Sequence, residues 1–326
     1  MSAYRVPAVT EQSTVVITGG GRGLGFQAAR QIAAARRDWR IVLGVRDVAA
    51  GSAAAEQINT ACGAEVAQPI ALDLTSLDSV RGFCAQVETL RGPPLRVVIA
   101  NVGIQVIGRE GRTQDGFEEM FGVNHLAHFL LVNLLIGRLE RPARVIFVSS
   151  DTHDPALSTG MPAPRWQDPE AMARDREGGT DTTAGRRRYT TSKLANVMTV
   201  YELDRRLRAN GSPGVSVFAF NPGLMPGTGL ARDYGPMARF AWRYVMPALT
   251  LVRPKTVRTT RRSGGDLAWL ATEPSLQGTS GRYFDGREER RSSEESYDRE
   301  KAASLWNASA RLTGLPATGA PATRPA

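Results

Sequence analysis

The sequence has few residues that bind metals or form cross-links. It contains two cysteines, Cys62 and Cys84, and three histidines among 326 residues. The cysteines match no metal-binding spacing, and a single pair is weak support for a disulfide, so we expect two buried, reduced thiols. His125 and His128 lie three residues apart with no further ligand nearby, so packing and hydrogen bonding explain them better than a metal. The sequence predicts no metal site.

Long apolar runs are also missing. No stretch approaches the roughly 18 uncharged apolar residues that span a membrane. Residues 1–14 lack the basic and apolar segments of a secretory signal. We therefore expect a cytoplasmic protein without an integral membrane segment. The most apolar late stretch, 240–252, is interrupted by Arg243. It predicts a partly buried helix, with a helix resting on a membrane surface as the alternative.

Lysine is scarce, so arginine carries nearly all of the positive charge. The net charge is +9, and the only lysines are Lys193, Lys255 and Lys301. The arginines are scattered and are not interleaved with aromatic residues; the densest group, Arg186 to Arg188, falls in an expected loop. An anionic cofactor and a solvated basic surface explain this pattern better than nucleic-acid binding, which we do not expect.

Apolar, β-rich runs alternate with helical patterns along the chain. Continuous apolar runs suit strands buried on both faces of a parallel sheet, and the alternation indicates βαβ units. The sequence therefore predicts a single α/β domain at 13–314, a Rossmann-type doubly wound parallel sheet flanked by helices. A flexible N-terminus (1–12) and a disordered tail (315–326) flank it. The expected strands are 14–18, 40–45, 65–72, 95–101, 144–149, 215–220 and 281–284; the expected helices are 23–36, one ending near 61, 76–90, two within 113–140 separated at Gly122, 189–209 and 257–271.

Two stretches lack this periodicity. Residues 151–188 are rich in Pro, Gly and Asp, which predicts a long loop with a short helix near 169–175, inserted beside the functional site. His153 in this insertion either lines the substrate pocket or packs inside the protein. Residues 224–254 form an expected substrate lid, although its aromatic part can equally be a helix packed on the core.

A glycine-rich loop follows the first expected strand, in the order Thr18-Gly19-Gly20-Gly21-Arg22-Gly23-Leu24-Gly25. Glycine lets the backbone turn sharply and approach a pyrophosphate, and the N-terminus of the following helix attracts an anion. This placement makes a dinucleotide site more specific than a glycine loop alone. The expected contacts of the cofactor are Gly19, Gly21, Gly23, Leu24 and Gly25.

The end of the second strand favours NADP(H) over NAD. NAD-binding folds tend to hold an acidic residue there for the ribose hydroxyls, whereas this chain has Arg46 followed by Asp47. A guanidinium matches a 2′-phosphate, and Arg22 can reach the same group; the alternative is that both arginines are ordinary surface charges. Asp73, at the end of the third strand and followed by Leu74, is expected to accept a hydrogen bond from the adenine amino group.

Tyr189 and Lys193 are four residues apart, so they lie on one face of the expected helix. A free tyrosine has a pKa near 10, and a neighbouring ammonium group stabilises its phenolate and lowers that pKa. Such a tyrosine can donate a proton to a carbonyl oxygen while a nicotinamide delivers hydride. Alone, this spacing is common by chance.

Together these motifs resemble the short-chain dehydrogenase/reductase family over roughly residues 13–314. The family's catalytic tetrad, cofactor turns and glycine loop all have counterparts here. The matching segments are Thr18-Gly19 with Gly23 and Gly25, Asn101-Val102-Gly103, the helix segment around Asn124, Val148-Ser149-Ser150, Tyr189 with Lys193, and Asn221-Pro222-Gly223.

The resemblance implies a role for each matching residue. Tyr189 would be the general acid, or the base in the reverse direction. Lys193 would lower its pKa and hold the nicotinamide ribose. Ser150 would donate a hydrogen bond to the substrate carbonyl, and Asn124 would hold a water that relays protons to Lys193. The further cofactor contacts implied are Asn101, Gly103, Pro222, Gly223 and Thr228, which would substitute for a Ser or Thr that relatives often carry at the preceding position.

Within the family, the chain is most similar to retinol-dehydrogenase-like and protochlorophyllide-reductase-like members. We expect hydride transfer to or from a carbonyl, an alcohol or an activated double bond of a lipophilic small molecule. No cysteine lies near the catalytic motifs, which argues against the light-driven reaction of the protochlorophyllide reductases. The alternative function is a non-catalytic NADP-binding sensor or scaffold. The resemblance also implies a homodimer or homotetramer, paired through the helices near Asn124 and Tyr189.

Overall fold

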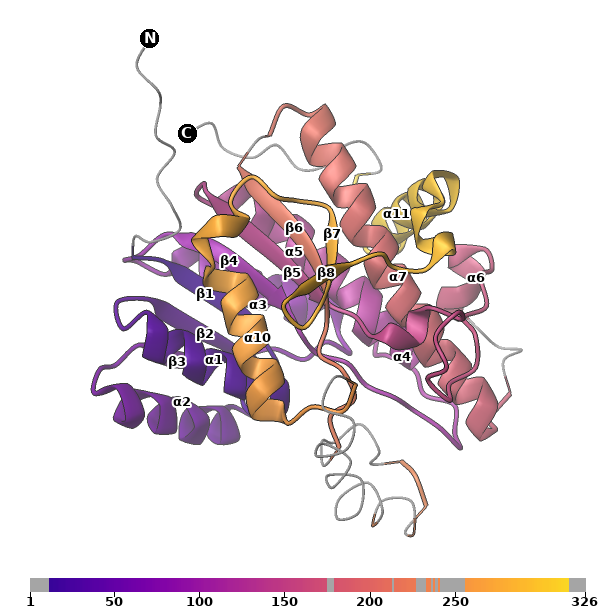
Figure 1. The fold of residues 1–326 in the computed structure, drawn as a ribbon, viewed down its shortest axis with the longest axis horizontal. Helices are drawn as coiled ribbons and strands as arrows, with labels where there is room; N and C mark the ends of the chain where they lie inside the picture. Colours follow the sequence, from indigo (N-terminus) through magenta and orange to yellow (C-terminus); the bar gives the residue numbers. More distant parts are fainter. Residues whose placement is uncertain are drawn as a thin grey trace.

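The computed structural model describes residues 12–174, 179–212, 214–226, 233–235, 237, 240 and 256–316. An eight-stranded sheet forms its centre in the order β3-β2-β1-β4-β5-β6-β7-β8 (Figure 1). Neighbouring strands are parallel from β3 to β7, and β8 is antiparallel to β7. The strands are β1 Thr14–Thr18, β2 Arg40–Val45, β3 Ala67–Ala71, β4 Leu95–Ala100, β5 Ala143–Val148, β6 Val215–Asn221, β7 Arg282–Asp285 and β8 Glu288–Arg290.

Helices cover both faces of the sheet, which confirms the predicted doubly wound α/β fold. Helices α1, α2 and α10 pack on one face, and α3, α5 and α7 on the other, with α11 outside α7 (Figure 1). Strands β1, β4, β5 and β6 are buried almost throughout because they contact helices on both sides. The α-helices are α1 Gly23–Ala35, α2 Val48–Cys62, α3 Leu77–Thr89, α4 Glu119–Phe121, α5 Ala127–Leu135, α6 Pro169–Arg174, α7 Thr182–Ala209, α10 Thr260–Thr272 and α11 Arg299–Leu312.

The predicted break at Gly122 is wrong. A π-helical turn, η1 (Gly122–Leu126), joins α4 to α5, so the helix runs on without interruption. A Cβ on Gly122 would overlap the Thr113 side chain. The glycine therefore allows close packing there and does not end the helix.

The second correction concerns the insertion. Helix α7 begins at Thr182, seven residues before Tyr189, so the last part of 151–188 is helical and not a loop. Asp181 caps this helix, because its Oδ1 accepts hydrogen bonds from the amides of Thr183 and Ala184 at 2.7 and 3.0 Å. The short helix expected near 169–175 is present as α6.

Helix α11 and strand β8 have no counterpart among the predicted elements. Helix α11 packs beside α7 and α6, with the Trp306 ring 4.8 Å from that of Phe129. Strand β8 ends the sheet with exposed charged residues, which discourage pairing with another edge. Leu315, assigned to the disordered tail, is partly buried against the core.

One helical stretch, Glu119–Arg138, is long and apolar enough to cross a membrane by length and composition. The expectation that no stretch approaches that measure is therefore wrong. Its most apolar window is 89 % buried inside the protein, as in the core helix of a globular fold. Of the two thiols, Cys84 is buried and Cys62 is only partly so; neither forms a disulfide. The predicted N-terminal segment and most of the predicted lid and tail lie outside the described residues.

Candidate active site

The predicted site residues gather at one edge of the sheet. Strands β1 to β6 are parallel, so their carboxyl ends share this edge, where doubly wound folds bind their ligands. The glycine loop follows β1, and Asn101 follows β4. Ser150 lies two residues after β5, and Pro222 follows β6 directly.

The glycine loop has the backbone that a dinucleotide needs. Gly19 and Gly23 have φ angles of +69° and +60°, in the region that favours glycine. A Cβ on Gly25 would lie 2.6 Å from the Gly19 carbonyl oxygen, so only glycine lets α1 approach the loop this closely. A Cβ on Gly23 would meet nothing within 4 Å. The first amides of a helix have no partner within the helix, so the N-terminus of α1 and this loop fit a phosphate.

Arg22 and Arg46 are both exposed beside this loop. Asp47 caps α2 instead, because its Oδ1 accepts a hydrogen bond from the Ala50 amide at 3.0 Å. Asp73 is similarly occupied: its carboxylate accepts hydrogen bonds from Thr75 at 2.9 Å and from the Gln114 amide at 3.3 Å. Leu24 and Leu74 are buried, and a Cβ on Gly21 would lie 3.3 Å from Val45 Cγ1.

The turn after β4 is fastened to β1. Asn101 Nδ2 donates to the Thr18 carbonyl at 2.7 Å, and the amides of Asn101 and Val102 donate to Thr18 Oγ1 at 2.8 and 3.1 Å. A Cβ on Gly103 would lie 2.9 Å from Lys193 Nζ. This turn therefore places bare backbone beside the lysine.

Strand β5 is connected to α7 through the candidate catalytic residues. Lys193 Nζ donates to the Val148 carbonyl at 3.0 Å, and Ser149 Oγ donates to the Lys193 carbonyl at 2.9 Å. The same ammonium lies 5.6 Å from the centre of the Tyr189 ring. Tyr189 and Lys193 are buried, and a hydrogen bond joins Ser150 to Tyr189. The structure thus brings Ser150, Tyr189 and Lys193 together.

Asn124 is fully buried in η1 and braces the same region. Its amide nitrogen donates to the Ile104 carbonyl and to Ser192 Oγ, both at 3.0 Å, and its Oδ1 accepts from the Ile104 amide at 2.8 Å. The side chain is thus occupied by protein groups. Any water that relays protons through Asn124 would have to use its backbone carbonyl.

Burial dominates the acid–base chemistry of the pocket. Burial raises the pKa of Tyr189 above its ordinary value of 10, the nearby Asp151 carboxylate raises it further, and the hydrogen bond with Ser150 lowers it. Burial lowers the pKa of Lys193 to about 8. Lys193 is not among the groups that shift this pKa here, so a lowering of the tyrosine pKa by Lys193 stays a prediction.

Two residues of the pocket have no sequence signal. Ser150 Oγ donates to Asp151 Oδ1 at 3.2 Å, and burial raises the pKa of this carboxyl group. Tyr234, in the short described part of the lid, donates to Gln105 Oε1 at 3.2 Å and accepts from Arg186 Nε at 3.1 Å. Only the fold reveals that these residues face the site.

His153 packs inside the protein and does not line the pocket, since it is 1 % exposed. Its Nδ1 lies 2.5 Å from the Ser150 carbonyl oxygen, and its Nε2 accepts from the Ser293 amide at 3.2 Å. His153 therefore fixes the backbone of the candidate serine to the C-terminal segment.

The turn after β6 lies at the same carboxyl edge of the sheet as the other site residues. Gly223 has a φ of +73°, and a Cβ there would lie 3.1 Å from the Thr256 carbonyl oxygen. The Pro222 carbonyl accepts a hydrogen bond from Ser263 Oγ at 2.6 Å. Thr228 lies outside the described residues.

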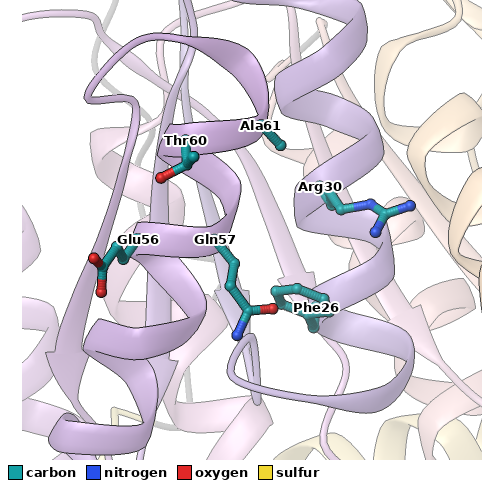
Figure 2. Close-up of a pocket in the computed structure, with 6 residues that line it drawn as sticks. All are labelled: Phe26, Arg30, Glu56, Gln57, Thr60 and Ala61. Carbon is teal, nitrogen blue, oxygen red and sulfur yellow. The ribbon is translucent and has the colours of Figure 1, made fainter.

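A separate cavity of about 450 Å³ lies between α1 and α2 (Figure 2). None of the candidate catalytic residues lines it. Figure 2 shows its lining side chains Phe26, Arg30, Glu56, Gln57, Thr60 and Ala61.

Comparison with known proteins gives consistent matches. A family model described as short chain dehydrogenase matches residues 13–159. Human retinol dehydrogenase 13 is 36 % identical over 93 % of this chain and 85 % of its own length. Protochlorophyllide reductase B from Oryza sativa subsp. japonica is 33 % identical over 93 % and 78 %. The crystal structure of an uncharacterized protein from Mycobacterium Paratuberculosis is 31 % identical, with a TM-score of 0.68 over 98 % of this chain and 99 % of the other.

Proposed function

Because this chain belongs to the short-chain dehydrogenase/reductase family of oxidoreductases, we propose that it transfers hydride between NADP(H) and the carbonyl or alcohol group of a lipophilic small molecule. Tyr189 is the general acid in reduction and the general base in oxidation. The observation that carries this proposal is the convergence of Ser150, Tyr189 and Lys193 at the carboxyl edge of the sheet, next to a glycine loop shaped for a dinucleotide.

The protonation states favour reduction. A raised pKa keeps Tyr189 protonated at neutral pH, the form that can donate to a carbonyl oxygen. The Ser150 hydroxyl stabilises the same oxygen as negative charge develops on it, once its hydrogen turns from Asp151 Oδ1 to the substrate. Lys193, charged below a pKa of about 8, attracts the phenolate left after donation. The cofactor, when bound, supplies the hydride.

The preference for NADP(H) rests on the two exposed arginines. Arg22 and Arg46 flank the loop, whereas Asp47, the acidic residue available for ribose hydroxyls, is engaged as the cap of α2. A guanidinium beside the ribose attracts a 2′-phosphate much more strongly than a neutral hydroxyl in its place. Arg46→Ala should therefore weaken NADPH binding and leave NADH binding nearly unchanged.

The names of the relatives support the proposed substrate class. Retinol dehydrogenase 13 is named for a long apolar alcohol, so retinal is the first probe we would use. Reduction of an activated double bond is the second candidate, since protochlorophyllide reductase B is similar over nearly the same share of the chain.

Thermal unfolding with NADPH and, in parallel, with NADH tests the cofactor, and NADPH oxidation with retinal tests catalysis. A ligand at 100 times its Kd adds about 2.7 kcal/mol to stability. We expect a higher Tm with NADPH than with NADH, and we expect Tyr189→Phe to keep the NADPH shift and lose turnover. A Tyr189→Phe variant that still turns over would refute the mechanism. A response to neither nucleotide would favour the sensor or scaffold role.

A further inference from the structure

His128 joins the two halves of the candidate site. It is fully buried on α5, one turn after Asn124. Its Nε2 lies 2.9 Å from Thr18 Oγ1, at the last residue of β1 before the glycine loop. Its Nδ1 lies 3.1 Å from the Asn124 carbonyl oxygen. One imidazole thus spans from the cofactor loop to the backbone of the catalytic asparagine.

The hydrogen-bond partners allow one arrangement of protons. Thr18 Oγ1 accepts two backbone amides, from Asn101 and Val102, so its single hydrogen is left for His128. Nε2 must therefore accept. The Asn124 carbonyl can only accept, so Nδ1 must carry the proton. The ring is a neutral Nδ1–H tautomer with both nitrogens engaged.

This neutral form is stable at working pH. The pKa of His128 is lowered to about 4: burial is the main cause, the hydrogen bond to Asn124 raises the pKa, and the nearby Lys193 ammonium lowers it. Protonation would also place a hydrogen on Nε2, opposite the hydroxyl hydrogen of Thr18. The bridge therefore acts as a fixed connector and does not titrate near neutral pH.

We infer that His128 is a positioning residue for the proposed hydride transfer, with a separate task for each nitrogen. Nε2 holds the Thr18 hydroxyl, which in turn fixes the turn of Asn101 and Val102 beside the glycine loop. Nδ1 holds the Asn124 carbonyl and with it the η1 turn that faces Lys193. The inference rests on the proposed function, because the two tasks correspond to cofactor binding and proton transfer.

Two conservative substitutions separate the two tasks. In His128→Asn, the amide nitrogen occupies the place of Nδ1 and can still donate to Asn124, but nothing reaches Thr18. In His128→Gln, the amide oxygen reaches the place of Nε2 and can accept from Thr18, but the donor to Asn124 is lost. Thr18→Val removes the same hydroxyl and also the acceptor of the Asn101 and Val102 amides, so it should weaken cofactor binding at least as much as His128→Asn; Thr18→Ser should retain the wild-type behaviour.

The expected result is a division between cofactor affinity and turnover. NADPH titration should give a Kd raised about three- to tenfold in His128→Asn and Thr18→Val, and nearly unchanged in His128→Gln. With retinal at saturating NADPH, kcat should fall by a similar factor in His128→Gln and little in His128→Asn. Equal effects of the two substitutions on both quantities would overturn the inference.

His125→Gln is the matched control. His125 is also fully buried on the same helical stretch, but its Nε2 bonds Ser309 Oγ in α11 at 2.8 Å, away from the cofactor loop. We expect this variant to lower Tm without separating Kd from kcat. If it produced the same division, His128 would have no special role.

A spectroscopic test needs neither substrate nor cofactor. The chain has three histidines, so a ¹⁵N-histidine-labelled sample of the full protein gives three assignable rings. Long-range ¹H–¹⁵N spectra should show His128 as the Nδ1–H tautomer from pH 6 to pH 9. An Nε2–H ring, or titration near pH 6.5, would overturn the inference. Failure of the wild type to bind NADPH would instead refute the proposed function and leave the tautomer assignment standing.

Discussion

At the scale of single residues, Asp151 sets the charge of the pocket. Its carboxylate accepts from Ser150 Oγ and raises the pKa of Tyr189, so two of the proposed catalytic groups respond to it. Family motifs mark Ser150 and Tyr189 in the sequence, and the structure brings these two side chains together. It gave no sign of Asp151, because the effect of this residue depends on a tertiary approach to α7. The sequence likewise gave no sign that the Asp73 carboxylate accepts hydrogen bonds from Thr75 and Gln114.

We expect Asp151→Asn to shift the pH profile to lower pH. Removal of the negative charge lets the pKa of Tyr189 fall. In alcohol oxidation, which needs the phenolate, the rising limb should move down by about half a pH unit or more. In carbonyl reduction, which needs the phenol, the alkaline decline should begin earlier. Profiles of kcat with retinol and retinal would measure both limbs.

Asp154→Asn controls for the general loss of a charge in this loop. Asp154 lies three residues further on and caps the Ala156 amide at 3.0 Å, but it is not among the groups that shift Tyr189. The pH profile of kcat for Asp154→Asn should match that of the wild type. Identical shifts of the pH profile in Asp151→Asn and Asp154→Asn would mean that Asp151 acts only through the overall electrostatic field of the protein.

At the scale of elements, the early start of α7 positions Tyr189. The seven residues before the tyrosine contain no large apolar side chain and carry three arginines, so they lack the apolar periodicity that predicts a helix. Asp181 nonetheless caps the helix, and Gly185 lies against the backbone of Val106. The sequence also does not predict the π-helical turn at Asn124, because no residue pattern distinguishes such a turn from an α-helix. Capping and close packing, not periodicity, determine these two features.

Alanine substitutions at two helical glycines should therefore have opposite effects. A Cβ at Gly185 would overlap the Val106 carbonyl oxygen and lie 2.9 Å from Ile107 Cγ2. Gly185→Ala should cost about 1–3 kcal/mol of stability and lower turnover, because Gly185 lies one turn before Tyr189. Gly82 in α3 is exposed with nothing within 4 Å. Gly82→Ala should add about 0.5–1 kcal/mol. Urea unfolding measures both, and destabilisation of the two variants alike would contradict the packing argument.

At the scale of the whole molecule, α11 covers the helices through which the family resemblance implied pairing. Trp306 lies against Phe129 of α5, and Ser309 bonds His125 of η1. Arg206 of α7 stacks 4.8 Å from the Trp306 ring. The doubly wound parallel sheet followed from the alternation of apolar runs and helical patterns, whereas α11 did not. Its buried face mixes alanine, serine and a few large side chains, which gives a weak apolar stripe.

Pairing of two subunits through α5 and α7 would require α11 to move away from these helices. We therefore expect the full chain not to self-associate through the face that α5 and α7 form. Trp306→Ala should lower stability by about 3–5 kcal/mol, because it leaves a cavity beside Phe129, and should promote self-association by loosening the cover. Sedimentation velocity and urea unfolding measure the two effects. Trp269→Ala is the control, since Trp269 packs near Phe284 on the α10 side of the sheet. It should reduce stability without changing the sedimentation coefficient. A wild-type dimer that Trp306→Ala dissociates would show instead that α11 is part of the interface, and the covering role inferred for this helix would be wrong.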